Sequence, residues 1–297
     1  MELQNPNPLI SVVIPTYNRA DFIKEAIDSV LAQTYPNFEI LVVDDGSTDN
    51  TRDILKEYSQ EPRFRYFYQK NQGQSVARNY ALSEARGDFV CFLDSDNRWL
   101  PYKLEVSLQA FRDHPDVSIV YGDIITINEE GQEVSRQNMR RYSGRITPYL
   151  FQDNCVSMNT SMTRRQCFNE MGGLEVGRRA ADDYELWLRF SARYKFLYIR
   201  EFLAEYRVME NQISSNKDRR FQSNREIMEN FVRRFPDALT PAEQKEGWCR
   251  FHVRKGRYHA SVGELAKAAQ EYWQALGYQP FSKTPWRAVA RLALLQR

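Results

Sequence analysis

The sequence lacks long apolar runs, paired cysteines and a strong net charge, and each absence removes a class of protein. Its 297 residues contain no uninterrupted apolar stretch near the roughly 18 residues of a membrane span. The first residues lack a basic segment followed by an apolar one, so we expect a cytoplasmic protein. Four cysteines without a CxxC spacing predict reduced, mostly buried thiols. A net charge of +2 is too small for the broad basic field used in nucleic-acid binding.

Histidine is also scarce, and this affects how catalysis is expected to work. The chain has only three histidines. His114 ends a predicted helix, while His252 and His259 lie in the polar carboxyl-terminal part, where structural roles are expected. If the reaction needs a general base near neutral pH, a carboxylate is therefore the expected source.

The first hundred residues alternate short apolar segments with amphipathic ones, a pattern typical of βαβ units around a parallel sheet. Strands are predicted at 10–14, 39–43, 64–68, 89–93 and 117–121, and a hairpin turn at 129–132. Helices are predicted at 21–33, 49–59, 75–86, 101–113, 165–171 and 182–193, with capping side chains at Asp21, Asp49 and Ser75. The Arg-rich stretch 134–153 has little periodicity and is expected to be a mobile loop.

The remainder of the chain is polar, Arg-rich and helical, without a clear strand. We therefore predict two parts: an α/β domain over 1–207 and a separate helical region over 208–297. From about residue 237 the helical region resembles a tetratricopeptide-type hairpin, although one hairpin is too few for a repeat array. The last segment, 286–297, is amphipathic and basic. It could lie on an anionic membrane, at the inner face of the plasma membrane, or pack its apolar stripe onto the preceding helices.

Polar residues follow the predicted strands, where open α/β sheets bind their ligands. The first strand is followed by Pro15, Thr16, Tyr17, Asn18 and Arg19, the second by Asp44 and Asp45, and the fourth by Asp94, Ser95 and Asp96. Because parallel strands end at the same edge of a sheet, acidic groups should gather at one rim.

Asp94-Ser95-Asp96 is a candidate metal site. Carboxylates two apart in an extended segment point to the same side, so they can share a Mn²⁺ or Mg²⁺ ion or divide it with a ribose hydroxyl. A short Asp-rich surface turn would have the same sequence. The position directly after the apolar segment FVCFL favours the metal site.

Asp45 and Arg78 each have a functional and a structural interpretation. The Asp45 carboxylate could accept the imide N–H of a uracil, or belong to an Asp-Gly turn with a helix cap at Asp49. Arg78 lies one turn into a predicted helix that faces the rim, so it could meet a diphosphate or be a solvated helix arginine.

The helix ADDYELWLRF supplies a candidate base and a candidate stacking ring. Asp182 and Asp183 suit the amino-terminal end of a helix on dipole grounds alone, but one of them could be a general base. Trp99 and Trp187 could stack on a sugar face or belong to the core.

Five ordered segments resemble the family 2 glycosyltransferases of the GT-A fold. They are SVVIPTYNRA at 11–20, VVDDGSTD at 42–49, NQGQSVARN at 71–79, FLDSDN at 92–97 and the GG…ADDYELWLR stretch at 172–189, and the resemblance covers residues 9 to about 207. It implies a GT-A nucleotide-sugar-binding fold, a Rossmann-like and mostly parallel sheet flanked by helices. The family often has Glu-Asp where this chain has Asp182-Asp183, and Asn97 replaces the second Asp of a frequent DSDD version.

The resemblance also implies roles for individual residues. Pro15, Tyr17 and Asp45 would hold the base, usually uracil, with Thr16, Asn18, Arg19, Asp44 and Ser95 beside the nucleotide. Arg78 would approach the diphosphate, Asp94 the ribose or metal, and Asp96 a Mn²⁺ or Mg²⁺ ion. Asp183 would be the general base of an inverting transfer. Trp99, Asn154, Asp182 and Trp187, with the segments 134–153 and 174–181, would lie on the acceptor and sugar side.

The implied activity moves a sugar from a UDP-sugar or other nucleotide-sugar to a hydroxyl of a glycan or a lipid-linked acceptor. Two alternatives remain. A Mg²⁺-dependent phosphohydrolase of the haloacid dehalogenase type also has DxD after a strand, but it needs Thr or Val where this chain has Asn97. A non-catalytic sugar-nucleotide-binding or protein-binding module would use the helical region for assembly.

Overall fold

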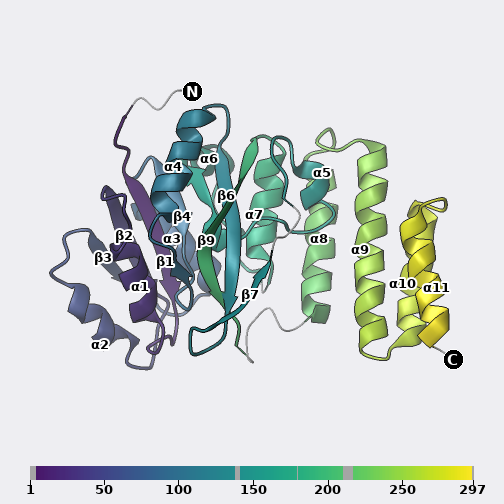
Figure 1. Cartoon of the computed structure of the whole chain (residues 1–297), viewed down its shortest axis with the longest axis horizontal. Helices are drawn as coiled ribbons and strands as arrows, with labels where there is room; N and C mark the ends of the chain where they lie inside the picture. The colour runs from purple at the N-terminus through teal and green to yellow at the C-terminus, as the bar shows by residue number, and fades with distance from the viewer. Residues whose placement is uncertain (1–4, 138–140, 179, 210–216, 296–297) are drawn as a thin grey trace.

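The computed structural model describes residues 5–137, 141–178, 180–209 and 217–295. A nine-stranded sheet in the order β3-β2-β1-β4-β8-β6-β9-β5, with β7 beside β6, forms the centre of the molecule (Figure 1). The four amino-terminal strands are parallel, and all four were predicted from their apolar sequences. They are β1 (Ile10–Thr16), β2 (Phe38–Asp44), β3 (Phe64–Tyr68) and β4 (Phe89–Phe92). Their carboxyl ends meet at one rim, which confirms the predicted α/β class.

The other half of the sheet is mixed. It contains β5 (Arg98–Trp99), β6 (Ile119–Ile127), β7 (Glu133–Gln137), β8 (Met162–Arg164) and β9 (Phe196–Arg207). The hairpin turn at 129–132 is confirmed, since it joins β6 to the antiparallel β7. A mobile loop over 134–153 is wrong for much of that stretch, because β7 reaches Gln137 and α5 (Thr147–Leu150) also lies there; residues 138–140 lie outside the described residues.

Helices cover both faces of the sheet. On one face, α1 (Ile23–Leu31), α2 (Thr51–Leu55) and α4 (Lys103–Asp113) share a core with the Ile10, Val12 and Ile14 side chains of β1. On the other face, α3 (Gln74–Glu84), α6 (Arg165–Met171) and α7 (Asp182–Ser191) pack on Val13, Leu41 and Phe92. Short 3₁₀ turns occur at Lys56–Tyr58 and Met158–Thr160.

None of the three predicted capping residues is the N-cap of its helix. Asp21 caps nothing, because α1 begins at Ile23 after Phe22. Ser75 lies inside α3, which begins after Gly73 in a positive-φ conformation. Asp49 does act near the start of α2, where its carboxylate accepts the Thr51 N–H at 3.0 Å.

The carboxyl-terminal helices extend from one end of the molecule (Figure 1). They are α8 (Lys217–Arg234), α9 (Pro241–Ser261), α10 (Leu265–Tyr278) and α11 (Lys283–Leu295). Ile227, Met228 and Phe231 of α8 and Phe251 of α9 belong to the same core as α7, and the other side of α9 shares a smaller core with α10 and α11. Helix α8 therefore packs as part of the main core, and the domain boundary predicted at residue 207 stays a prediction.

The apolar stripe of α11 packs onto its neighbours, as one of the two interpretations predicted. Ala288 and Leu292 are buried against α9 and α10. Within the described parts of the chain, no helix has the length and apolar character needed to cross a bilayer.

Candidate active site

The first two loops of the rim are hydrogen-bonded to each other. Asn18 has a positive φ of 50°, its N–H donates to Ser47 Oγ at 2.9 Å, and its Oδ1 accepts the Thr48 N–H at 2.8 Å. Gly46 also has a positive φ, and a Cβ there would lie 2.8 Å from the Asn71 backbone nitrogen. The turn after β2 thus needs glycine, and the loops are fixed before any ligand binds.

The two carboxylates after β2 are buried and hydrogen-bonded. Asp44 accepts the Ser47 N–H at 2.8 Å and the Tyr66 hydroxyl at 3.1 Å. Asp45 is 3% exposed and accepts three bonds, from Gln69 Nε2 at 2.7 Å and from the Gln72 and Gly73 N–H groups at 2.8 Å. A carboxylate has about four acceptor sites, so one site remains, on Oδ2. The base-binding role of Asp45 stays a prediction.

Asp94 is held in place by Asn159, a residue that the sequence analysis did not identify. The Asn159 amide donates to Asp94 Oδ2 at 2.9 Å and accepts the Asp94 N–H at 2.8 Å. Asn97 also donates to Oδ2, at 3.4 Å. Asn159 is 3% exposed and lies in a short turn without a sequence motif, so the neighbouring residues did not identify it as part of the site.

Asp96 is the carboxylate best placed to hold a cation. Among the described residues, its side chain pairs with Arg19 Nε at 3.4 Å. Burial and the nearby Asp94 carboxylate raise its pKa, although Arg19 acts in the opposite direction. Hard carboxylate oxygens are the donors that Mn²⁺ and Mg²⁺ prefer, so Asp94 and Asp96 fit such an ion. No described group of three or more His, Cys, Asp or Glu side chains could hold a metal ion, so further ligands would come from nucleotide or water.

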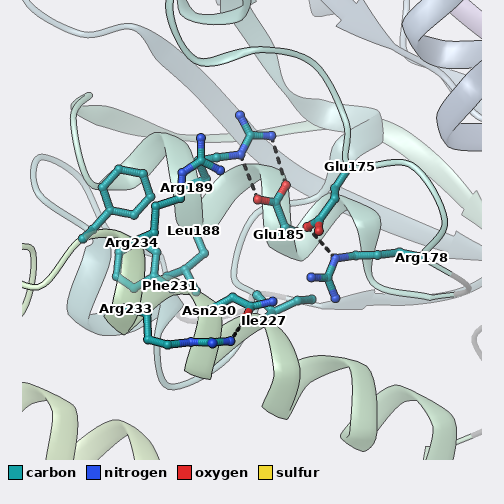
Figure 2. Close-up of a pocket in the computed structure, with 11 residues that line it drawn as sticks. Glu175, Arg178, Glu185, Leu188, Arg189, Ile227, Asn230, Phe231, Arg233 and Arg234 are labelled. Carbon is teal, nitrogen blue, oxygen red and sulfur yellow. Dashed lines mark hydrogen bonds and ion pairs between the residues drawn. The ribbon is translucent and has the colours of Figure 1, made fainter.

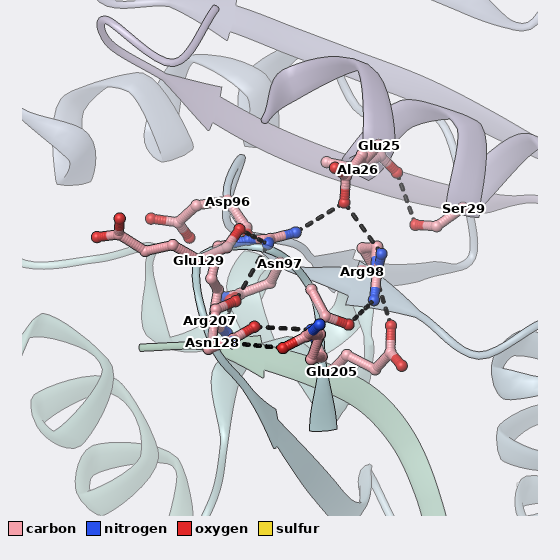
Figure 3. Close-up of polar contacts among 12 residues, drawn as sticks. Glu25, Ala26, Ser29, Asp96, Asn97, Arg98, Asn128, Glu129, Glu205 and Arg207 are labelled. Atoms are coloured by element: carbon pink, nitrogen blue, oxygen red, sulfur yellow. Dashed lines mark hydrogen bonds and ion pairs between the residues drawn. The ribbon is translucent and has the colours of Figure 1, made fainter. Parts of the chain in front are cut away.

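Arg207 fixes the backbone around Asp96 and was also missed. It lies at the end of β9, is 1% exposed, and donates through Nε to the Asp96 carbonyl at 2.9 Å. Its N–H bonds Asn97 Oδ1 at 2.8 Å, and its guanidinium also contacts Glu25 at 2.7 Å and the Asn128 and Glu129 carbonyls (Figure 3). Through Arg207, the end of β9 is therefore joined to α1, to the turn after β6 and to the Asp94–Asp96 turn.

Arg78 connects the acidic turn after β4 to the start of α7. It is 3% exposed and donates to Asp94 Oδ1 at 2.6 Å and to Asp182 Oδ2 at 2.7 Å. Burial alone would lower its pKa, but the two carboxylates outweigh burial and raise it. The interpretation of Arg78 as a solvated helix arginine is wrong. Contact with a diphosphate stays a prediction, and both terminal nitrogens are already engaged by carboxylates.

The two carboxylates that begin α7 have different surroundings. Asp182 is 5% exposed and accepts bonds from Gln74, Ser75 and Arg78. Asp183 accepts only the Asn154 amide and the Tyr184 N–H, both at 2.8 Å, among the described contacts. Asp182 is thus an anchor to α3, and Asp183 is the carboxylate with acceptor sites left. Asn154, predicted on the acceptor side, lies directly beside it.

The pKa of Asp183 suits a base near neutral pH. Burial and the adjacent Asp182 raise it to about 6, while Arg220 and Arg78 act in the opposite direction. The preceding residue, Ala181, has a positive φ of 62°. Strained backbone of this kind often occurs at functional sites.

Both tryptophans are buried, which favours the core interpretation over stacking on a sugar. Trp187 is fully buried in the core. Trp99 is 3% exposed, its Nε1 donates to the Asn159 carbonyl at 2.7 Å, and the Lys103 ammonium lies over its ring. Of the other rim residues, Pro15, Thr16 and Ser95 are buried, whereas Tyr17 is 46% exposed.

Two pockets lie away from these carboxylates. One, of about 400 Å³, lies between α7, α8 and the segment before α7 (Figure 2). In it Glu175 pairs with Arg178 and Glu185 with Arg189, each at 2.8 Å. The other, of about 500 Å³, lies among α8, α9 and α10. Neither includes Asp45, Asp96 or Asp183, so the described pockets do not unite the three predicted site carboxylates.

Residues 11–181 match the family described as Glycosyl transferase family 2. The chain belongs to this family. The haloacid dehalogenase alternative is therefore wrong. The family assignment agrees with the resemblance in the sequence, and its matched range contains the rim loops, Arg78 and the Asp94–Asp96 turn.

The named relatives cover different amounts of the chain. The Escherichia coli UDP-Glc:alpha-D-GlcNAc-diphosphoundecaprenol beta-1,3-glucosyltransferase WfgD is 33% identical over 75% of this chain and 87% of its own length. An uncharacterized glycosyltransferase of Rickettsia felis is 34% identical over 67% of this chain, but the chain spans only 33% of that protein.

Solved structures share the fold at low identity. Staphylococcus aureus TarS 1-349 in complex with UDP-GlcNAc has a TM-score of 0.61 at 20% identity, over 91% of this chain and 88% of that one. The mannosyltransferase PcManGT from Pyrobaculum calidifontis, in complex with GDP-Man and Mn²⁺, has a TM-score of 0.67 at 20% identity, over 97% and 80%. These likenesses show the GT-A fold.

Proposed function

We propose that the protein is an inverting glycosyltransferase that moves a sugar from a UDP-sugar to a hydroxyl of a glycan or lipid-linked acceptor. The observation that carries this proposal is the connection between Asp183 and the Asp94–Asp96 turn. Arg78 binds Asp94 with one nitrogen and Asp182, the neighbour of Asp183, with the other. One buried guanidinium thus connects the turn that carries the candidate metal ligands to the start of the helix that carries the candidate base.

In this reaction Asp183 would accept the proton of the acceptor hydroxyl. That oxygen attacks the anomeric carbon from the face opposite the diphosphate, and the bond to the diphosphate breaks with its electron pair leaving on UDP. The Asn154 amide, 2.8 Å from Asp183 Oδ2, orients the carboxylate. Bound at Asp94 and Asp96, a Mn²⁺ or Mg²⁺ ion would neutralise negative charge on the departing diphosphate.

The donor and acceptor classes come from the relatives. TarS binds UDP-GlcNAc in its solved complex, and the name of WfgD specifies UDP-Glc and a lipid-linked diphosphate acceptor. PcManGT was solved with GDP-Man and Mn²⁺, so a guanine nucleotide is the alternative donor class. In this proposal Pro15, Tyr17 and the remaining acceptor site of Asp45 bind the base.

The test is donor turnover with UDP-glucose, UDP-GlcNAc and GDP-mannose in Mn²⁺. We expect turnover with a UDP-sugar, and Asp183→Asn to lower it at least 100-fold while UDP affinity stays within a few-fold. Asp113→Asn, which changes an exposed carboxylate on α4, is the matched control and should behave as wild type. Nucleotide binding without turnover of any of the three donors would instead support the non-catalytic module.

A further inference from the structure

The α10–α11 hairpin exposes more large aromatic surface than any other described part of the chain. Trp273, Phe281 and Trp286 are 65%, 97% and 51% exposed, and they are the only Trp or Phe side chains among the strongly exposed described residues. Tyr278, between them in sequence, is 37% exposed. Single exposed apolar residues are ordinary, but several large rings within a short segment indicate an interaction surface.

These side chains lie near one end of the hairpin. Phe281 is in the turn between the two helices, and Trp286 is on the first turn of α11. Trp273 is five residues before the end of α10, or about 8 Å along the helix axis at 1.5 Å per residue. The turn lies at the end of the molecule farthest from β1–β3 (Figure 1).

The charges of this segment all have one sign. Residues 272–297 contain no Asp or Glu, whereas Lys283, Arg287 and Arg291 are basic. All three belong to α11 and are exposed. A second copy of the hairpin would meet like charge, whereas an anionic surface would be attracted.

Most packing of the hairpin uses other side chains, although Tyr278 stacks on Trp248 and His252 of α9 and Trp286 Nε1 donates to the Pro280 carbonyl at 2.7 Å. Ala288 and Leu292 of α11 and Tyr272 and Ala275 of α10 form the contacts with α9. The apolar stripe of α11 is therefore already used within the protein. The surface available to a partner is the separate set of aromatic and basic side chains around the turn.

We propose that the α10–α11 turn docks peripherally on an anionic phospholipid membrane. The rings of Phe281, Trp286 and Trp273 lie at the level of the lipid headgroups, and Lys283, Arg287 and Arg291 contact lipid phosphates. Aromatic rings with neighbouring cations match the composition of such interfaces. This inference is independent of the proposed glycosyl transfer, because docking needs neither donor nor acceptor.

The test is co-sedimentation of the full chain with vesicles of phosphatidylcholine, with and without 30% phosphatidylglycerol, at two salt concentrations. We expect binding to the anionic vesicles only, weakened by salt. Phe281→Ser should lower the partition coefficient about tenfold. Lys283→Glu/Arg287→Glu should lower it at least on the order of 30-fold. Phe281 is almost fully exposed, so its substitution should not disturb the fold.

Matched controls lie elsewhere on the surface. Val134→Ser removes a 63% exposed apolar side chain from β7, and Arg225→Glu/Lys245→Glu makes the same charge change on α8 and α9. Both should bind vesicles as wild type does. Equal binding to neutral vesicles, or full binding by Phe281→Ser, would overturn the proposal. So would light scattering that shows a dimer lost in Phe281→Ser together with no vesicle binding, since the turn would then be an interface between copies.

Discussion

At the residue scale, the adjacent carboxylates Asp182 and Asp183 show how surroundings assign different chemistry to identical side chains. Asp182 accepts hydrogen bonds from three side chains of α3, and one of them, Arg78, compensates its charge. Asp183 is partly buried beside that charge and receives two hydrogen bonds. Desolvation and a like charge both favour its protonated form, which is how a carboxyl becomes a base useful near neutral pH.

The first prediction concerns pH. Asp183 must be ionised to accept a proton, so turnover should fall as pH drops through its pKa of about 6. At pH 5, kcat/KM should be about one tenth of its plateau value. The charged groups around Asp183 are Asp182, Arg220 of α8 and Arg78 of α3. A profile of donor turnover from pH 4.5 to 8 measures the loss of activity on the acid side. A midpoint near pH 4 would contradict the assignment of Asp183 as the base.

The second prediction concerns Asn159. Asn159→Ala removes the hydrogen bonds to the Asp94 carboxylate and from the Asp94 N–H, so of its described partners only Arg78 and Asn97 would still hold the carboxylate. We expect the Mn²⁺ concentration for half-maximal activity to rise about 30-fold, because two hydrogen bonds of roughly 1 kcal/mol each are lost. Titration of activity with Mn²⁺ measures this. Asn37→Ala, which removes a side-chain bond to the Asn7 carbonyl, is the control and should leave the titration unchanged.

The sequence predicts site residues where a motif identifies them, and it fails where a single residue acts through position. Asp94, Asp96 and Asp183 occur in recognisable segments at strand or helix ends. Asn159 and Arg207 have no such context, and their roles depend on the turn and strand that bring them to Asp94 and Asp96. The sequence also does not show which charged residues are buried. An arginine on a helix is usually exposed to solvent, yet Arg78 is only 3% exposed.

At the element scale, strands with both faces covered were predictable and β9 was not. β1, β2 and β4 are buried along their whole length and have near-continuous apolar sequences. β9 includes the exposed Arg200 and Glu201, near the point where its register with β6 shifts after Tyr121. This irregularity interrupts the period of two on which strand prediction depends.

The third prediction concerns α7, which Arg189 ties to the segment before it. Arg189 bonds the carbonyls of Met171, Gly172 and Gly173 and pairs with the buried Glu185. Arg189→Met would leave Glu185 without its cation and three carbonyls without a donor. We expect the free energy of unfolding to fall by about 3–5 kcal/mol, measured by urea unfolding.

The control for this change lies four residues further along the chain, just after the end of α7. Arg193 pairs with Glu170, but its side chain is 59% exposed. Arg193→Met should change the free energy of unfolding by less than about 1 kcal/mol, because exposed ion pairs contribute little. Equal losses in the two variants would mean that the contacts of Arg189 do not stabilise the segment before Asp182.

At the scale of the whole molecule, the helical region is two structures with different relations to the sheet. α8 supplies Ile227, Met228 and Phe231 to the core that contains Trp187. The α10–α11 hairpin belongs to a core shared only with α9. Sequence could identify the change from sheet to helices near residue 207, since periodicity changes there. It could not identify which helices share the main core, because that depends on contacts between distant segments.

The last prediction follows from these two cores. A chain ending at residue 263 lacks α10 and α11 but keeps every contact of α8 with α7, so it should unfold cooperatively and retain donor turnover within about threefold. A chain ending at residue 216 lacks α8 and exposes the side of the core around Trp187, where burial of each large apolar side chain contributes roughly 1.5–3 kcal/mol. We expect that chain to lose cooperative unfolding in urea, followed by tryptophan fluorescence. In the chain ending at residue 263, Cys249 and Val253 of α9 are no longer covered by α10 and α11. The urea concentration at its unfolding midpoint should therefore be lower than that of the full chain. If the chain ending at 216 were instead as stable as the full protein, α8 would be an attachment to the α/β domain and the predicted boundary at 207 would separate two folding units.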